Sequence, residues 1–315
     1  MAGDGNFTSK LNQLLSTSPT GALEVLTALN IFLSITASLG NALVLVALHK
    51  VSSLHPPTKL FFRCLAVTDL CVGLIVQPLE VAYNLSLLTK MADLRAVYYV
   101  YDACASSSII LCGVSIFTLA AISVERLLAL LLGLRYRHVV TLRRVRVVII
   151  CFWLIGASGA VVWVWREDIA KRQILAAIIL SLLTSISCYT WIHLKLRRQQ
   201  AQVQNHVIPG QPNGRGTPLS MARYKKSVSS TLWVQLALAA CYIPLAIVAV
   251  LGANDRTQVL HHVHVNGIAY DGIPWSTAIS LVYLNSSLNP ILYCWKIREV
   301  RQQVKDTIKQ LYRSI

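Results

Sequence analysis

The chain has 315 residues, of which 55% are hydrophobic and only 13% are charged. Soluble domains carry roughly a quarter of their residues as charged side chains, so this composition excludes an ordinary soluble protein and indicates a membrane protein. The formal net charge of +16 fits either a nucleic-acid-binding protein or a membrane protein whose basic residues gather on one side of the bilayer.

Apolar stretches long enough to cross a bilayer recur along the chain. About 20 helical residues span the ~30 Å of hydrocarbon, and the stretches are continuous rather than alternating in polarity, which excludes the strands of a membrane barrel. We therefore predict an all-α membrane protein, a seven-transmembrane helix bundle over residues 22–295. The expected helices are 23–49, 59–87, 97–133, 145–165, 170–194, 228–252 and 274–295.

The basic residues fix the expected orientation. Most of the 29 Lys and Arg residues fall in the first, second and third inner loops and in the tail after the last helix, so the positive-inside rule places the N-terminus outside and the C-terminus in the cytoplasm. The positive net charge is then explained by the membrane topology of the chain, and we expect no nucleic-acid partner. Residues 1–21 are polar and lack the pattern of a cleavable signal peptide. They form an expected extracellular tail in which Asn6 opens a glycosylation sequon.

Residues 296–315 predict an amphipathic helix. Apolar residues recur every three or four positions, and Lys and Arg fall elsewhere on the helical wheel. The apolar positions are Ile297, Val300, Val304, Ile308 and Leu311. Such a helix lies on the inner membrane surface, where anionic lipids attract it. A solvated cytoplasmic tail is the alternative.

Charged residues inside the predicted spans are rare. Asp69 lies well inside the second span, and Glu125 and Arg126 lie toward the end of the third. A charged side chain at the centre of a membrane helix costs roughly 2.5–3.5 kcal/mol, so each such residue indicates function.

Several motifs, each in its own predicted span, together resemble the rhodopsin-like (class A) G-protein-coupled receptors. They include the Glu125-Arg126 pair and the sequence Asn289-Pro290-Ile291-Leu292-Tyr293. The others are Gly40-Asn41, Leu65 to Asp69, Trp153, Tyr189 and Cys241 to Pro244. The resemblance implies a multi-pass plasma-membrane receptor, not an enzyme, that binds an extracellular ligand and activates heterotrimeric G proteins by a helix-bundle rearrangement. A seven-helix transporter or channel is the alternative, although the few buried charges do not favour it.

The resemblance assigns a switch at the cytoplasmic end. At rest Glu125 holds Arg126, and on activation Arg126 meets the G protein. Leu134 in the second inner loop is the expected apolar contact to that protein. Tyr189, Asn289, Pro290 and Tyr293 complete the switch. Leu127 replaces the usual Tyr after Arg126, so we expect a weak latch and elevated basal activity.

Tyr242 and Pro244 in the sixth span correspond to the toggle and the kink beneath the ligand pocket. Tyr242 replaces the usual Trp, so the toggle is smaller and more polar. Pro244 and Pro290 each remove a helical hydrogen bond and supply a pivot.

The resemblance also implies an allosteric sodium ion in place of any cofactor. Its expected ligands are oxygen donors, as a hard cation requires. They are Asp69, Ser115, Asn285, Ser286 and Asn289, with Asn41 adjacent. A protonated Asp69 hydrogen-bonded within the bundle is the alternative.

The expected ligand pocket is mostly apolar with a few polar groups, as ligand sites usually are. Its residues are Glu80, Asp102, Ser108, Cys112, Gln173, Tyr242, Leu245, Trp275, Ile279 and Tyr283. Ser108 replaces the aspartate that holds biogenic amines, and Tyr283 replaces the lysine that holds retinal, so the expected ligand is a peptide or a lipid-like or nucleoside-like small molecule. Glu80 and Asp102 near the mouth either receive a basic peptide residue or a divalent cation, or are solvated surface carboxylates.

Two absences point to a branch of the family. The second outer loop is reduced to about REDIAKR and contains no cysteine, and Tyr101 stands where the partner cysteine of the third helix usually lies. The usual outer disulfide is therefore missing, and the fifth helix lacks its usual proline. These features make the chain most similar to the cluster of melanocortin, cannabinoid, lysophospholipid and adenosine receptors.

Overall fold

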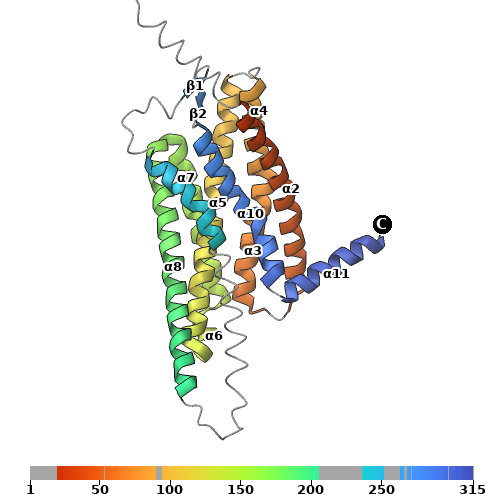
Figure 1. Ribbon diagram of the computed structural model, residues 1–315, viewed down its shortest axis with the longest axis vertical. Helices are drawn as coiled ribbons and strands as arrows, with labels where there is room; N and C mark the ends of the chain where they lie inside the picture. Colours follow the sequence, from red (N-terminus) through yellow and green to blue (C-terminus); the bar gives the residue numbers. More distant parts are fainter. Residues whose placement is uncertain are drawn as a thin grey trace, which may run out of the picture.

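The computed structural model describes residues 20–52, 54–89, 94–205, 236–251, 263–265, 268–270, 272–296 and 298–314. Over these residues the chain forms a bundle of long helices, with a small hairpin at one end and a helix that points away from the other end (Figure 1). Asn6, the centre of the predicted third inner loop, and two of the histidines near the hairpin lie outside the described residues.

The first two predicted spans form α2 (Thr20–Lys50) and a segment with three parts, α3 (Pro56–Cys71), the π-helix η1 (Val72–Val76) and α4 (Gln77–Thr89). Proline is accepted at the start of α3 because the first helical N–H groups have no partner within the helix. The wide π turn ends at Val76, two residues before Pro78, and contains Leu74, the residue four positions before that proline. Because a proline ring clashes with the carbonyl four residues earlier in a regular helix, the wider turn provides space for that ring.

Glycine allows α2 to approach its neighbours closely. The Ser34 hydroxyl donates a 2.7 Å hydrogen bond to the carbonyl of Gly73 in η1. A Cβ atom on Gly73 would lie 2.6 Å from Ser38 Oγ, and one on Gly40 would lie 2.9 Å from the ring of Pro290. These two glycines therefore set the packing distance of α2 against the second and seventh spans.

The third span is α5 (Leu94–Leu132), which packs against α3, α4, α7 and α8. It continues into the short helices η2 (Gly133–Arg135) and α6 (Tyr136–Val139) of the second inner loop. Gly133, in the position where the family usually has proline, adopts a positive φ of 51°. A glycine takes this conformation without the steric cost of a side chain.

The fourth and fifth spans are α7 (Leu142–Trp165) and α8 (Glu167–Asn205). Arg166 is the only non-helical residue between them. The outer loop predicted as REDIAKR is thus almost entirely helical, because Glu167 to Arg172 form the first turns of α8. The periodicity did not reveal this, since these turns are polar.

The remaining elements are the helix Leu236–Leu251, the antiparallel strands β1 (Val263–Val265) and β2 (Ile268–Tyr270), α10 (Gly272–Lys296) and α11 (Arg298–Ser314). The hairpin lies at the end of the bundle where α4 ends (Figure 1). The sequence analysis did not predict it, and His264 lies in β1.

The helical bundle is confirmed. In the described residues, five helices are long and apolar enough to cross a membrane by length and composition alone, and Leu236–Leu251 is a shorter apolar helix. The seventh predicted span forms α10, whose 25 residues include several buried serines and asparagines. The all-α class is therefore correct, with the β hairpin as an addition.

The helix α11 docks on the C-terminal end of α2. Val300 is buried and Val304 packs against the core of the bundle. Lys50 Nζ donates to Thr307 Oγ1 at 3.4 Å and to Gln310 Oε1 at 3.1 Å. The expected periodicity places Val300 and Val304 on the packed face, whereas Ile308 is 39% exposed. Contact of α11 with the membrane surface stays a prediction.

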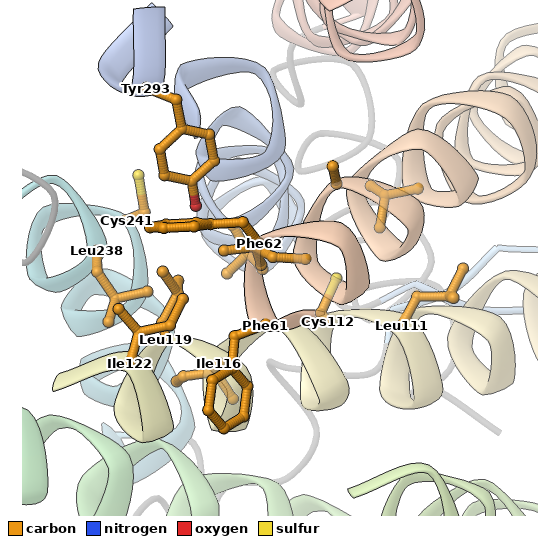
Figure 2. Packing of buried hydrophobic residues seen from close by; sticks show 14 of the residues in the cluster. Phe61, Phe62, Leu111, Cys112, Ile116, Leu119, Ile122, Leu238, Cys241 and Tyr293 are labelled. Carbon is orange, nitrogen blue, oxygen red and sulfur yellow. The ribbon is translucent and has the colours of Figure 1, made fainter. Parts of the chain in front are cut away.

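The core of the inner half is apolar. Leu238 lies beside Leu119 and Ile122, and Tyr293 faces Phe62 (Figure 2). The Phe62 and Tyr293 rings meet edge to face with centroids 5.0 Å apart. Along α5, Leu119 and Ile122 lie between Ser115, which contacts Asp69, and the Glu125-Arg126 pair.

Candidate functional site

A cavity of about 350 Å³ opens between six of the spans, and its wall is mostly apolar. Nine of the ten residues predicted for the pocket line it, from Glu80 on α4 to Tyr283 on α10. The resemblance to the receptor family had assigned these positions to the pocket.

Asp102 does not line the cavity, contrary to the expectation. It is a quarter turn of α5 from Tyr101 and close to Tyr98, to which its carboxylate is hydrogen-bonded. The predicted pair of carboxylates is therefore reduced to Glu80. The sequence could not decide whether Asp102 faces the cavity, because the answer depends on how α5 is rotated within the bundle.

Polar side chains form a connected chain along one wall of the cavity. Cys104 Sγ lies 3.4 Å from Glu80 Oε2 and 3.9 Å from the Tyr283 hydroxyl. Ser108 Oγ lies 3.3 Å from the same hydroxyl and 3.8 Å from Cys112 Sγ. Glu80 is 8% exposed and ends this chain. The wall thus joins a carboxylate on α4 to hydroxyl groups on α5 and α10.

Beneath the cavity, Asp69 is fully buried and holds three hydrogen bonds. Its Oδ1 accepts from Ser286 Oγ at 2.8 Å and from Ser115 Oγ at 3.3 Å, and its Oδ2 accepts from Asn289 Nδ2 at 2.7 Å. Helices α3, α5 and α10 supply these groups. The structure therefore brings together residues that lie more than 200 positions apart in the sequence.

The cluster also contains oxygens that lack a partner. Asn285 Oδ1, Asn289 Oδ1 and Asn41 Oδ1 are buried and form no hydrogen bond with a described residue. A buried acceptor left without a partner costs roughly 1–3 kcal/mol. A carboxylate together with hydroxyl and amide oxygens is the kind of donor set that a small hard cation prefers, so these residues are compatible with the expected sodium ion. Asp69, Ser115 and Asn285 would supply ligands to it.

The Glu125-Arg126 pair lies at the inner end of α5. Arg126 Nε is 3.5 Å from Glu125 Oε2, and the side chains are 31% and 4% exposed, respectively. Among the described residues this is the only ion pair of Arg126. The arrangement agrees with the expected latch on a single carboxylate.

Two further groups donate hydrogen bonds to Glu125, and neither was predicted from the sequence. Thr58 Oγ1 donates a 2.6 Å hydrogen bond to Glu125 Oε1, and the hydroxyl of Tyr136 also donates to this oxygen. Tyr136 belongs to the second inner loop and follows Arg126 by ten residues. The only signal in the sequence was an aromatic hydroxyl within the basic run LRYRH.

The other predicted switch residues occupy the same inner half. Leu134 is 97% exposed on η2. Tyr189 is buried with Ile192 and Leu196 against α5, and the buried Tyr293 hydroxyl has no hydrogen-bond partner among the described residues. Leu134 is thus free of packing within the chain, as a docking residue requires.

Tyr242 and Pro244 lie on the helix Leu236–Leu251. Tyr242 is 3% exposed, lines the cavity, and its hydroxyl lies 3.5 Å from the carbonyl of Cys112. It therefore links the floor of the cavity to the middle of α5.

None of the eight cysteines, all within the described segments, forms a disulfide. The outer bridge is absent, as expected.

Comparison with known proteins supports the same class. Residues 40–173 match the family described as 7 transmembrane receptor (rhodopsin family). Similar proteins include melanocortin receptor 4 of Danio rerio, which is 24% identical over 90% of this chain and 84% of its own length. Adenosine receptor A3 of Ovis aries is 26% identical over 86% of each chain, and the histamine H2 receptor of Cavia porcellus is 28% identical over 86% of this chain and 76% of its own length.

The helical bundle, its cavity and its buried polar cluster are compatible with a multi-pass membrane receptor, and the similar proteins are receptors rather than enzymes. Over residues 40–173 the chain is thus similar to the rhodopsin family of seven-transmembrane receptors, and melanocortin and adenosine receptors of the predicted branch are among the similar proteins.

Proposed function

We propose that the chain is a plasma-membrane receptor with its N-terminus outside, in which ligand binding in the cavity shifts the bundle toward a conformation that activates a heterotrimeric G protein. The ligand must bind the active conformation more tightly, because a ligand with equal affinity for both conformations shifts nothing. Residues 1–21 and 296–315 are then the extracellular tail and the cytoplasmic helix of one receptor domain.

The observation that carries this proposal is the arrangement of three polar sites along α5. Ser108 lines the cavity, Ser115 contacts Asp69, and Glu125 and Arg126 end the helix. Because one rigid helix joins the three sites, a ligand, a sodium ion at Asp69 and a G protein at Arg126 would each bias the same two-state bundle.

For the ligand, the cavity supports a peptide side chain or a lipid-like or nucleoside-like molecule. Most of its wall is apolar, and its hydrogen-bonding groups are hydroxyl, thiol and carboxylate groups on one side. Relatives include histamine and 5-hydroxytryptamine receptors. The position that holds an amine in such a receptor is Ser108 here, and its neutral hydroxyl cannot supply the charge.

The test is ligand-free activation of a panel of G proteins in cells that express this chain or Arg126→Ala at matched surface level. We expect basal signalling that Arg126→Ala abolishes, and Arg63→Ala, on α3, serves as the matched control. Equal signalling by the wild type and Arg126→Ala contradicts the proposal.

A further inference from the structure

The end of the cavity nearest the connection between α7 and α8 is bounded by large side chains in contact with one another. The rings of Tyr101 on α5 and Trp163 on α7 have centroids 6.1 Å apart. Lys171 Nζ on α8 lies 5.9 Å from the centroid of Trp163 and 5.4 Å from that of Trp275 on α10. An ammonium group within about 6 Å of an indole face is attracted to it. All four residues line the cavity, so contacts that join four spans narrow this outer end.

At the middle of α5, the wall between α5 and α7 contains small residues instead. Ile109 packs against Gly159, where an added Cβ atom would lie 3.2 Å from Ile109 Cγ2. About two turns further along α5, Phe117 packs against Phe152, with ring centroids 5.5 Å apart. Gly113 lies midway between these contacts on the same face of α5. It lines the cavity, and no described atom beyond its own helix backbone lies within 4 Å of the position of a Cβ, so the two helices leave a gap there.

The gap reaches the flank of the bundle where α7 and α8 lie side by side (Figure 1). Ile155 on α7 lines the cavity, yet it is 52% exposed. Ser158 on α7 and Gln173 on α8 also line the cavity and are exposed, and residues of both kinds mark an opening. From Ile155, α7 continues to Trp165, roughly 15 Å of helix. The opening therefore faces the hydrocarbon of the bilayer rather than the water above it.

The face of α5 that points toward α10 is polar. Ser108 Oγ and the Tyr283 hydroxyl lie 3.3 Å apart. The neighbouring thiols are those of Cys112, 3.8 Å from Ser108 Oγ, and Cys104, 3.9 Å from the Tyr283 hydroxyl. Thiols are weak hydrogen-bond partners, so a carbonyl or hydroxyl group of a ligand would displace them. The cavity thus combines neutral hydroxyl groups with an opening into hydrocarbon at Gly113, roughly 8 Å further along α5.

We propose that the cavity opens into the bilayer between α7 and α8 beside Gly113, and that this opening holds the alkyl chain of a single-chain amphiphile whose neutral polar end bonds to Ser108 and Tyr283. This inference rests on the proposed receptor function and names the ligand class of the same cavity. Such a ligand concentrates in the membrane and enters from there, without passing the large side chains at the outer end.

The opening is tested by occupancy alone, without any G protein, so its failure is separate from failure of the proposed function. The probe is monopalmitoylglycerol with a diazirine at the middle of its chain, photolysed with the purified full chain in phosphatidylcholine nanodiscs and mapped by mass spectrometry. We expect crosslinks at Ile155 and Ser158 that excess unlabelled monopalmitoylglycerol reduces severalfold. Crosslinks at Phe32 and Ile35, which are 62% and 54% exposed on α2, report ordinary lipid contact and should not be reduced.

Two substitutions close the opening from different helices. Gly113→Leu fills the gap from α5, and Ser158→Trp covers it from the exposed side of α7. Each should reduce the competed crosslinks severalfold. The matched controls, Gly21→Leu and Ala157→Trp, add the same side chains at positions outside the cavity wall and should leave the crosslinks unchanged. A variant is compared only if it elutes as the wild type does in size-exclusion chromatography, and either substitution is sufficient for the test.

The polar end of the ligand is tested by Tyr283→Phe. This change should raise the concentration of unlabelled monopalmitoylglycerol for half competition at least threefold. Tyr99→Phe, at a tyrosine that is 71% exposed and does not line the cavity, is the control. Hexadecane, which has the chain without a polar end, should not compete. Unchanged competition in Tyr283→Phe, or equal competition by hexadecane, overturns the assignment of the polar end.

Crosslinks at the opening that the unlabelled ester does not reduce overturn the proposal, as do crosslinks that persist undiminished in Gly113→Leu or Ser158→Trp. A second arm distinguishes a single-chain ligand from the lipid of the bilayer itself. Equal labelling of Ile155 and Ser158 by a phosphatidylcholine with a diazirine in its chain would show that bulk lipid fills the opening, which also overturns the proposal. Labelling confined to the single-chain probe supports it.

Discussion

At the scale of single residues, Glu125 is the group that would hold the proposed switch at Arg126. It is the only ion-pair partner of Arg126 in the described part of the chain, and its other oxygen accepts hydrogen bonds from Thr58 and Tyr136. The hydrogen bonds from Thr58 and Tyr136 hold the Glu125 carboxylate in place near the end of α5, but they do not hold Arg126 directly. The latch therefore depends on one partly exposed ion pair.

Glu125→Gln should raise ligand-free signalling. A partly exposed ion pair contributes about 1 kcal/mol, so its loss shifts the resting equilibrium by a factor of about 5. The measurement is basal G-protein activation at matched surface level, with Glu299→Gln on α11 as the control. Basal activity that is unchanged or lower in Glu125→Gln contradicts the latch.

Asp69 is the residue at which a sodium ion would act. If sodium binds there, it stabilises the folded receptor by mass action, by about 1.4 kcal/mol at ten times its dissociation constant. The melting temperature of the purified protein should then rise by roughly 3–5 °C when NaCl replaces KCl. Asp69→Asn should remove this difference. A sodium effect that persists in Asp69→Asn would show that the ion binds elsewhere.

At the scale of elements, the π-helix η1 sets the rotation of α4. The extra residue in its turn rotates everything that follows, including Glu80 and Tyr83, which line the cavity. Its position is fixed by contact with α2, through the bond from Ser34 to the Gly73 carbonyl.

Gly73→Ala should destabilise this contact. The new Cβ would lie 2.6 Å from Ser38 Oγ and 2.9 Å from the Ser38 backbone nitrogen, and crowding of this kind costs roughly 1–3 kcal/mol. Gly113→Ala is the control, since nothing lies within 4 Å of its Cβ position. Thermal unfolding in detergent checks the prediction, and an equal melting temperature for the two variants would refute it.

The elements also show where sequence reasoning succeeds and where it stops. The apolar runs predicted α5 and α7 to within three residues at each end, because hydrophobic length is a local property. The π-helix and the one-residue connection at Arg166 were missed. Pro78 is a local signal near the π-helix, but a proline alone does not distinguish a π turn from a kink. The connection at Arg166 depends on packing between helices, which the local residue pattern does not show.

The candidate site divides in the same way. The pocket residues and the Asp69 cluster were predicted, because the family motifs fix which face of each helix turns inward. The contacts of Tyr136 with Glu125 and of Lys171 with Trp163 and Trp275 were not. Each of these contacts joins two segments that come together only in the tertiary structure. The position of Asp102 outside the cavity wall was missed for the same reason.

At the scale of the whole molecule, the orientation in the membrane stays a prediction from the basic residues. It places Asn6 outside, whereas Asn285, also in a sequon, is buried within the bundle. Removal of N-linked glycans should therefore lower the apparent mass of the wild type but not of Asn6→Gln. Ser287→Ala, which removes the sequon of Asn285, should keep the mass shift. A chain without any glycan at Asn6 would not support an outer N-terminus.

The central claim is that this bundle activates a G protein through Arg126. The most direct measurement is nucleotide exchange on purified heterotrimeric G proteins by the purified receptor in lipid nanodiscs, with Arg126→Ala as the comparison. We predict that the wild type accelerates exchange on at least one G protein without ligand and that Arg126→Ala does not. Acceleration by both proteins to the same extent, or by neither, would contradict it.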